Sequence, residues 1–159
     1  MLSKFWFAFL LISSLGTTGF AQNSVEIPMG WLFPPKNAEL EFDYLKTYDK
    51  EPEKEGGLAS DTFPQSTTTY VYAEIEFKNL LYKIRDQEYE FTFKYFLENG
   101  KRLGEYTTLY TFEKDWSVAY YSDSWGWSTP GKWPLGTHRV EVWLNGNKFA
   151  VKRFTIVNK

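Results

Sequence analysis

Alternation of apolar and polar residues is the strongest pattern along the chain, and it predicts β-strands. Between Glu88 and Tyr95 the odd-numbered residues are all aromatic, while the even-numbered residues are polar. Because successive side chains of a strand point to opposite faces, this segment is typical of a strand with one buried face and one solvated face.

Weaker alternation of the same kind predicts further strands on both sides of this one. They cover residues 38–48, 66–77, 103–110, 138–144 and 149–157, with one more near 117–121. Asn99-Gly100 and Asn145-Gly146 separate neighbouring strands. Asn and Gly tolerate positive φ, and Asn-Gly is typical of the type I′ turn of a β-hairpin, so we expect two hairpins.

The segments between the strands indicate loops. Residues 49–65 are rich in Glu, Gly and Pro and predict a loop, and residues 78–86 are long enough only for a helical turn. About six to eight strands without a convincing helix predict an all-β protein, an antiparallel immunoglobulin-like β-sandwich in a single domain over residues 38–159.

The first residues of the chain are typical of an export signal. Lys4 precedes an apolar run over residues 5–12, and a stretch of small and polar residues ends at Ala21. The apolar run is shorter than the roughly 20 residues that span a bilayer, so we favour a cleaved signal peptide (residues 1–21) over an uncleaved membrane anchor. We therefore expect a periplasmic or secreted protein, not held in a membrane after cleavage, that begins with an extended arm over residues 22–37.

Charge and residue content exclude several kinds of partner and of chemical site. The formal net charge is -2 and the pI is near 5.5, so no positive field attracts nucleic acid. The sequence contains no cysteine, which excludes disulfides, thiolate nucleophiles and thiolate metal sites. No sequence motif indicates a cofactor or a metal ion. Aromatic residues make up 20% of the chain, and aromatic side chains favour strands.

Candidate catalytic groups are few. His138 is the sole histidine and shares the parity of Val140 and Val142, so we interpret it as a packed strand residue rather than as a base. Two pairs of acids share strand faces and are spaced as a glycosidase pair could be. These pairs are Glu74 with Glu76 and Glu88 with Glu90. Same-face acids are ordinary on the wet side of a sheet, so we expect no enzymatic activity.

The distinctive stretch of the chain is the aromatic segment 116–133. Its candidate ligand-binding residues are Trp116, Tyr121, Trp125, Trp127 and Trp133. In one interpretation exposed rings form a platform for a sugar or an apolar peptide, because ring faces stack on apolar surfaces while the indole N–H donates a hydrogen bond. In the other, which we favour, the rings cap one end of a small sandwich that has no disulfides.

The end of the chain resembles small exported bacterial immunoglobulin-like proteins of unknown function. The motif residues are Gly126-Trp127, the run Trp133-Pro134-Leu135-Gly136 followed by Val140-Glu141-Val142 and Gly146, and the final Phe154-Thr155-Ile156. The resemblance covers roughly the last third of the chain and implies a closing pair of strands. It also implies that the position of His138 is often aromatic, and it carries over no catalytic residue.

These observations together predict an exported, non-catalytic binding module whose partner is an unknown protein or carbohydrate ligand. The alternatives are a glycan-directed hydrolase that uses paired carboxylates and a periplasmic inhibitor or immunity-type protein. The inhibitor would use the acidic loop over residues 49–61 to mimic an anionic substrate.

Overall fold

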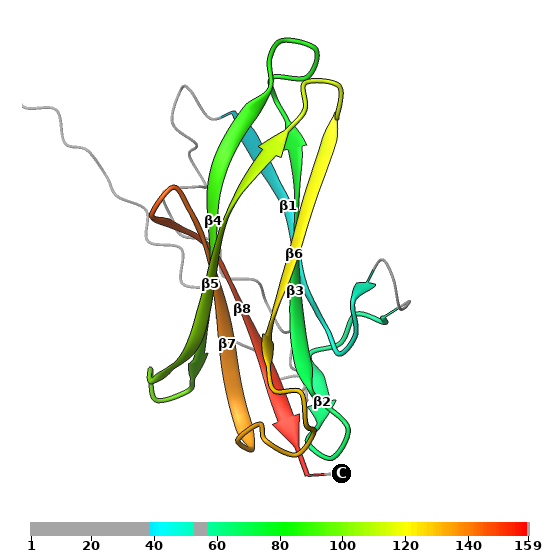
Figure 1. Ribbon diagram of the computed structural model, residues 1–159, viewed down its shortest axis with the longest axis vertical. Helices are drawn as coiled ribbons and strands as arrows, with labels where there is room; N and C mark the ends of the chain where they lie inside the picture. Colours follow the sequence, from blue (N-terminus) through cyan, green and yellow to red (C-terminus); the bar gives the residue numbers. More distant parts are fainter. Residues whose placement is uncertain (1–38, 53–56, 159) are drawn as a thin grey trace, which may run out of the picture.

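Two β-sheets form the computed structural model, which describes residues 39–52 and 57–158 (Figure 1). The strands are β1 (Leu40–Tyr48), β2 (Thr62–Pro64), β3 (Tyr70–Asn79), β4 (Gln87–Leu97), β5 (Arg102–Phe112), β6 (Val118–Gly126), β7 (Gly136–Leu144) and β8 (Asn147–Val157). Their order is β1-β3-β6 in one sheet and β2-β8-β7-β4-β5 in the other. The predicted fold class, an all-β immunoglobulin-like sandwich of about six to eight strands, is confirmed. The expected signal peptide (residues 1–21) and arm (residues 22–37) lie outside the described residues.

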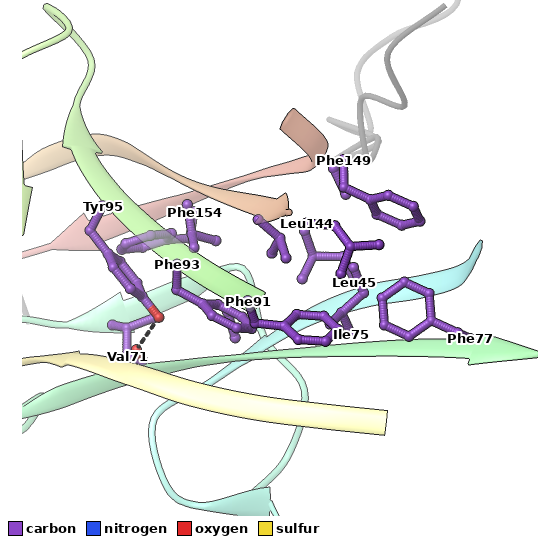
Figure 2. Packing of buried hydrophobic residues seen from close by; sticks show 14 of the residues in the cluster. Leu45, Val71, Ile75, Phe77, Phe91, Phe93, Tyr95, Leu144, Phe149 and Phe154 are labelled. Carbon is purple, nitrogen blue, oxygen red and sulfur yellow. Dashed lines mark hydrogen bonds between the residues drawn. The ribbon is translucent and has the colours of Figure 1, made fainter. Parts of the chain in front are cut away.

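The core lies between the two sheets. Figure 2 shows Phe91, Phe93 and Tyr95 of β4 facing buried residues of β3, which are Val71, Ile75 and Phe77. These side chains are all almost completely buried. The hydroxyl of Tyr95 donates to the carbonyl of Val71 at 3.1 Å, so a buried hydrogen bond joins the two sheets at this point (Figure 2). The alternation seen in the sequence therefore marks the strand face that packs against the opposite sheet.

The second predicted hairpin has the expected turn. Asn145 has φ 48° and Gly146 has φ 75°, so both turn residues lie in the left-handed region that a type I′ connection requires. In the first hairpin Gly100 has φ 85°. The two turns join β7 to β8 and β4 to β5, and these four strands form most of the five-stranded sheet.

Three segments differ from the sequence prediction. The segment 49–65, expected to be a loop, contains β2, which pairs parallel to β8 and is the exception to the antiparallel rule in the described sheets. The strand expected near 117–121 continues to Gly126, because residues 122–126 pair with β3 despite their Ser and Asp content. Residues 80–84 form consecutive turns rather than a helical turn, with Lys83 in the left-handed region. None of the helices in the described part of the chain is long and apolar enough to cross a membrane.

The two long sides of the sandwich differ. On one side β5 ends the larger sheet and β6 ends the smaller sheet, and no further described strand covers either edge. On the other side the segment before β2 links the sheets. There the N–H of Ser60 donates to the carbonyl of Thr47 on β1 at 2.9 Å, and Asp61 forms an ion pair with Lys152 on β8 at 2.9 Å. On the side formed by β5 and β6, the edges of both strands therefore lack a covering strand in the described part of the chain.

Candidate functional site

An aromatic groove lies on the β5–β6 side of the sandwich, between the end of β5 and the start of β6. Its volume is about 470 Å³. The lining residues are Tyr110, Trp116, Val118, Ala119, Tyr120, Tyr121 and Ser122. Ligand pockets of roughly 300–1,000 Å³ with mostly aromatic and apolar walls are typical of small-molecule sites. This groove, which we call the β5–β6 groove, is therefore the candidate functional site.

Strand alternation on β6 places the lining residues. Tyr121 pairs with Ile75 of β3 and Ala119 pairs with Phe77, so these two positions share the core-facing parity. Tyr120 has the opposite parity and is 46% exposed. Both faces of β6 therefore contribute to the groove, which lies at the strand's free edge.

A buried asparagine holds Trp116 in place. The side-chain amide of Asn79 donates to the carbonyl of Trp116 at 2.9 Å, and the N–H of Asn79 donates to the carbonyl of Ser117 at 2.9 Å. The Trp116 N–H donates to the carbonyl of Glu113 at 3.0 Å. These bonds fix the backbone of the β5–β6 connection, while the Trp116 side chain stays at the surface with 37% of the residue exposed.

The rings of the groove are tilted against each other. The centroid of Tyr110 lies 4.8 Å from that of Tyr121 with an interplanar angle of 54°, and 6.4 Å from that of Trp116 with an angle of 40°. Tyr121 also packs on Phe91 in the core, with centroids 5.5 Å apart. The aromatic residues therefore form a concave wall anchored on the core rather than a flat platform.

Tyr121 also contacts a carboxyl group that does not itself line the groove. The hydroxyl of Tyr121 donates to a carboxylate oxygen of Asp123 at 3.3 Å. Burial raises the pKa of the Asp123 carboxyl, and hydrogen bonds from Ser124 and Tyr121 oppose that rise. Burial, together with the negative charge of Asp123, raises the pKa of Tyr121 well above its ordinary value. The tyrosine thus remains a neutral hydrogen-bond donor and acceptor beside the carboxyl.

The five sequence-predicted site residues divide into two groups. Trp116 and Tyr121 line the β5–β6 groove, as described above. Trp133 is fully buried and its indole N–H donates to the carbonyl of Thr69 at 2.9 Å. Trp127 meets Trp133 edge-on, with an interplanar angle of 89°. Trp125 meets Trp127 at 69°. The last three tryptophans therefore pack as a cap at one end of the core, not as coplanar exposed rings.

Trp125 also fills the space between the edge strands. Its indole ring lies so close to Gly104 of β5 that a Cβ at that position would overlap the ring. Its ring nitrogen is buried, with no hydrogen-bond partner among the described residues. The glycine on β5 therefore allows Trp125 to close the gap between the sheets at the end opposite to Trp116.

The groove includes residues that sequence reasoning missed. Tyr110 was assigned to a strand without a role, and Val118 and Tyr120 lie inside the aromatic segment but were not singled out. Val118 and Tyr120 stand out from their neighbours because their side chains are exposed. That exposure results from their position on an edge strand, which the local sequence does not reveal. Nothing in the local sequence around Tyr110 indicates that it meets Trp116.

His138 lies in the core. It is 1% exposed, and its ring stacks on Phe154 with centroids 5.3 Å apart and an angle of 16°. Nδ1 lies 2.9 Å from the carbonyl oxygen of Gly136, and Nε2 is buried without a hydrogen-bond partner in the described part of the chain. Burial lowers the pKa of His138. The ring is therefore a neutral packing element, as the resemblance implied for this position.

The paired acids lie on the outer faces of the sheets. Glu74 of β3 is 7% exposed and accepts hydrogen bonds from the hydroxyls of Tyr44 and Tyr48, both at 3.0 Å. Burial raises the pKa of both tyrosines, and hydrogen bonds to acids raise it further, to Glu76 and Glu74 for Tyr44 and to Glu74 for Tyr48. Glu88 and Glu90 are exposed on β4. Neither pair lines the β5–β6 groove.

The acidic loop is described only in part. Residues 53–56 lie outside the described residues, and Asp61 is paired with Lys152. Asp49 and Lys50 line a shallow hollow of about 320 Å³ together with Leu58. Within the described ranges, no group of three or more His, Cys, Asp or Glu residues is arranged to hold a metal ion.

No protein-family model matches the sequence, and no curated protein matches it. Three solved structures are similar to this chain at low identity. The C-terminal domain of wzt is 6% identical with a TM-score of 0.49, over 88% of this chain and 81% of that one. An immunoglobulin-like protein from Pseudomonas aeruginosa is 12% identical with a TM-score of 0.46, over 77% of this chain and 100% of that one.

A third solved structure is the alkylpurine DNA glycosylase AlkC from Pseudomonas fluorescens, bound to DNA containing an abasic site analog. It is 10% identical with a TM-score of 0.47 over 75% of this chain, and the match spans 30% of the glycosylase. These likenesses concern the fold alone, and no activity or ligand of those proteins is transferred to this chain.

Proposed function

We propose that this chain is an exported, non-catalytic binding module, and that the β5–β6 groove binds a neutral carbohydrate. The proposal places it with the small exported bacterial immunoglobulin-like proteins that its C-terminal third resembles. The observation that carries it is the groove itself, in which Tyr110, Trp116 and Tyr121 surround an open volume of about 470 Å³.

The chemistry of the lining favours a sugar. None of the seven lining residues is charged, so a charged ligand would lose its hydration without gaining a partner of opposite charge there. Aromatic rings stack on the C–H face of a pyranose, and the hydroxyls of Tyr120, Tyr121 and Ser122 supply donors and acceptors for its OH groups. A neutral ligand with one apolar face and many hydroxyls matches both features.

The location of the acids argues for binding over hydrolysis. Glycoside hydrolysis needs two carboxyl groups on either side of the bond to be cleaved, about 5–10 Å apart. The pairs Glu74 with Glu76 and Glu88 with Glu90 lie on outer sheet faces, away from the lining residues. Asp123 contacts the groove residue Tyr121 but does not itself line the groove.

Binding can be measured by isothermal titration against a panel of neutral oligosaccharides. The variants are Trp116→Ala and Tyr120→Ala, and the matched control is Tyr82→Ala, because Tyr82 is 44% exposed but does not line the groove. Loss of one stacking ring should weaken binding about tenfold, which corresponds to roughly 1.4 kcal/mol. The control should bind as the unmodified protein does. Equal affinity in all four proteins, or no binding to any neutral glycan, would overturn the proposal.

A further inference from the structure

Three of the four arginines in the sequence lie in one row across the five-stranded sheet, although the chain contains fourteen lysines. Phe96 of β4 is opposite Arg102 of β5 on one side and opposite Arg139 of β7 on the other. Arg139 is in turn opposite Arg153 of β8. These arginines come from segments far apart along the chain, and the strand order brings them together. We call this set the arginine row.

The arginine row lies on the outer face of the sheet. Tyr95, which precedes Phe96, points into the core and is 1% exposed. Because successive side chains of a strand alternate between faces, Phe96 and its cross-strand partners point away from the core. Arg153 is exposed, and the side chains of Arg102 and Arg139 are 54% and 25% exposed. The row is therefore accessible to a ligand in solution.

Three contacts orient the guanidinium group of Arg139. Its carbon Cζ lies 4.3 Å from the centroid of the Phe96 ring. Nε donates to a carboxylate oxygen of Glu141 at 3.0 Å, and Nη1 donates to the carbonyl of Leu97 at 3.5 Å. A side chain that is already held in one orientation loses less conformational freedom when a ligand binds. Arg139 is therefore a pre-ordered part of the row.

Arg139 and Arg153 place two positive charges directly opposite each other in the β7–β8 pair. Side chains at such positions lie within contact distance, and like charges there are unfavourable for the folded protein. An oxyanion between the two guanidinium groups would offset this repulsion, because arginine binds a carboxylate through two parallel hydrogen bonds. Lysine, the commoner cation of this chain, lacks that planar geometry. The choice of arginine at these positions therefore favours an oxyanion as ligand.

The next outward-facing row of the sheet leaves positive charge in excess. Lys94 of β4 is opposite Glu105 of β5 and Glu141 of β7. Glu105 forms an ion pair within β5, and Glu141 is shared between Arg139 and Lys148. The two rows together carry four cations and two acids, whereas the whole chain has a net charge of -2. This part of the sheet is therefore a local positive surface on an acidic protein.

We propose that the arginine row binds the carboxylate groups of an acidic polysaccharide. Neighbouring strands lie about 4.8 Å apart, so a row across four strands extends about 14 Å. The strand positions of Arg102 and Arg139 are separated by about 10 Å, with Phe96 between them. A single carboxylate cannot contact both arginines over that separation. A polymer that carries acids at intervals along its chain can contact both at once.

The surroundings of the row favour a polysaccharide over a lipid surface or a nucleic acid. The apolar residues of the two rows are Phe96, which is half-buried, and Val151, which is buried, so neither projects far enough to enter a bilayer. Single-stranded nucleic acids bind through bases stacked on exposed rings, whereas Arg139 already stacks on Phe96. A hydroxylated chain with carboxylates needs neither feature.

Isothermal titration with two acidic polysaccharides tests the proposal. Hyaluronan carries a carboxylate on every second sugar and polygalacturonate carries one on every sugar. Arg153→Gln should weaken binding of the tighter polymer about tenfold, because it removes charge-assisted hydrogen bonds. The matched control is Arg85→Gln, which removes the fourth arginine of the chain, a residue with a 62% exposed side chain outside the row. Binding of neither polymer, or equal loss in the two variants, would overturn the proposal.

A conservative variant separates arginine geometry from net charge. Arg153→Lys keeps the charge but cannot form the paired hydrogen bonds, so it should also bind more weakly than the unmodified protein. Affinity equal to that of the unmodified protein would contradict recognition by the arginine pair. Arg139 is left unchanged in these tests, because it also pairs with the buried Glu141. Circular dichroism checks that each variant is folded.

Two comparisons exclude the other anionic partners and keep this site separate from the β5–β6 groove. Tighter binding to phosphatidylglycerol vesicles or to single-stranded DNA than to either polysaccharide, at equal concentrations of anionic groups, would overturn the proposal. None of the arginines of the row lines the groove. Arg153→Gln should therefore leave the binding of neutral oligosaccharides unchanged, so the two sites succeed or fail independently.

Discussion

Replacement of His138 by phenylalanine removes a buried polar atom from the core. Nε2 of His138 has no hydrogen-bond partner among the described residues, and the ring stacks on Phe154 and meets Trp133 edge-on at a centroid distance of 5.4 Å. Phenylalanine keeps both ring contacts. The bond from Nδ1 to the carbonyl of Gly136 is lost, but Gly136 is exposed, so water can replace it.

Two opposing contributions set the change in the free energy of unfolding that His138→Phe causes. Removing an unsatisfied buried polar group recovers about 1–3 kcal/mol of desolvation penalty. The slightly larger phenylalanine ring costs up to about 1–2 kcal/mol in a close-packed core. We therefore expect His138→Phe to raise the free energy of unfolding by about 1 kcal/mol at pH 7.5, which corresponds to a rise in Tm of about 4 °C for a domain of this size.

The same substitution should remove a pH dependence. Burial lowers the pKa of folded His138 below its ordinary value of 6.5, against a smaller opposite effect of the hydrogen bond to Gly136. The unfolded chain therefore takes up the proton first as the pH falls. The stability of the unmodified protein is fully present above about pH 6.5 and decreases as the pH falls from there toward the folded pKa, by at most about 1.4 kcal/mol per pH unit.

Urea denaturation at several pH values between 7.5 and 5.5 measures both effects. His138→Phe should be the more stable protein throughout, and its advantage should widen toward pH 5.5. His138→Ala serves as the control, because it loses the pH dependence but leaves a cavity and should be less stable. The reasoning is refuted if His138→Phe is destabilised at pH 7.5, or if the difference between it and the unmodified protein is constant over this range.

Three further predictions concern how the two sheets are joined. Gly104→Ala should displace Trp125, because the added Cβ overlaps its indole. We expect a red-shifted tryptophan emission and a decrease of about 1–3 kcal/mol in the free energy of unfolding measured by chemical denaturation. An unchanged emission spectrum would contradict this packing. Tyr95→Phe removes the hydroxyl that donates across the core and should cost about 1–3 kcal/mol, so a loss below about 0.5 kcal/mol would contradict its bridging role. Asp61→Asn removes a carboxylate that forms an ion pair with the buried Lys152 and should lower the free energy of unfolding by about 3 kcal/mol. Adding Lys152→Met should restore part of that loss. Additive effects in this double-mutant cycle would show that the two residues are not coupled.

The fold was predictable from the sequence to a large extent. The aromatic alternation that ends at Tyr95 identified β4 and its buried face, and Asn145-Gly146 identified the turn between β7 and β8. Both signals are local, since strand period and turn preference depend on residues within a few positions of each other. The strand β2 escaped prediction because three residues give too short a pattern, and its pairing with β8 is a long-range contact.

The candidate site was predictable only in part. The aromatic segment contains Trp116 and Tyr121, which line the β5–β6 groove, but it also contains Trp133, which is fully buried. The local composition around Trp116 and Trp133 is similar, so composition did not separate a groove residue from a cap residue. Tyr110 belongs to a different strand, and its place beside Tyr121 depends on how the two sheets pack.

Local sequence patterns indicate which segments become strands, where the tight turns lie, and which face of each strand is apolar, because these properties follow from the period of the backbone and from the φ preferences of single residues. Only the tertiary structure decided that β5 and β6 both end their sheets on the same side of the sandwich. That arrangement produces the β5–β6 groove. It depends on strand order, which is set by contacts between residues far apart along the chain and so leaves no periodic signal in any one segment.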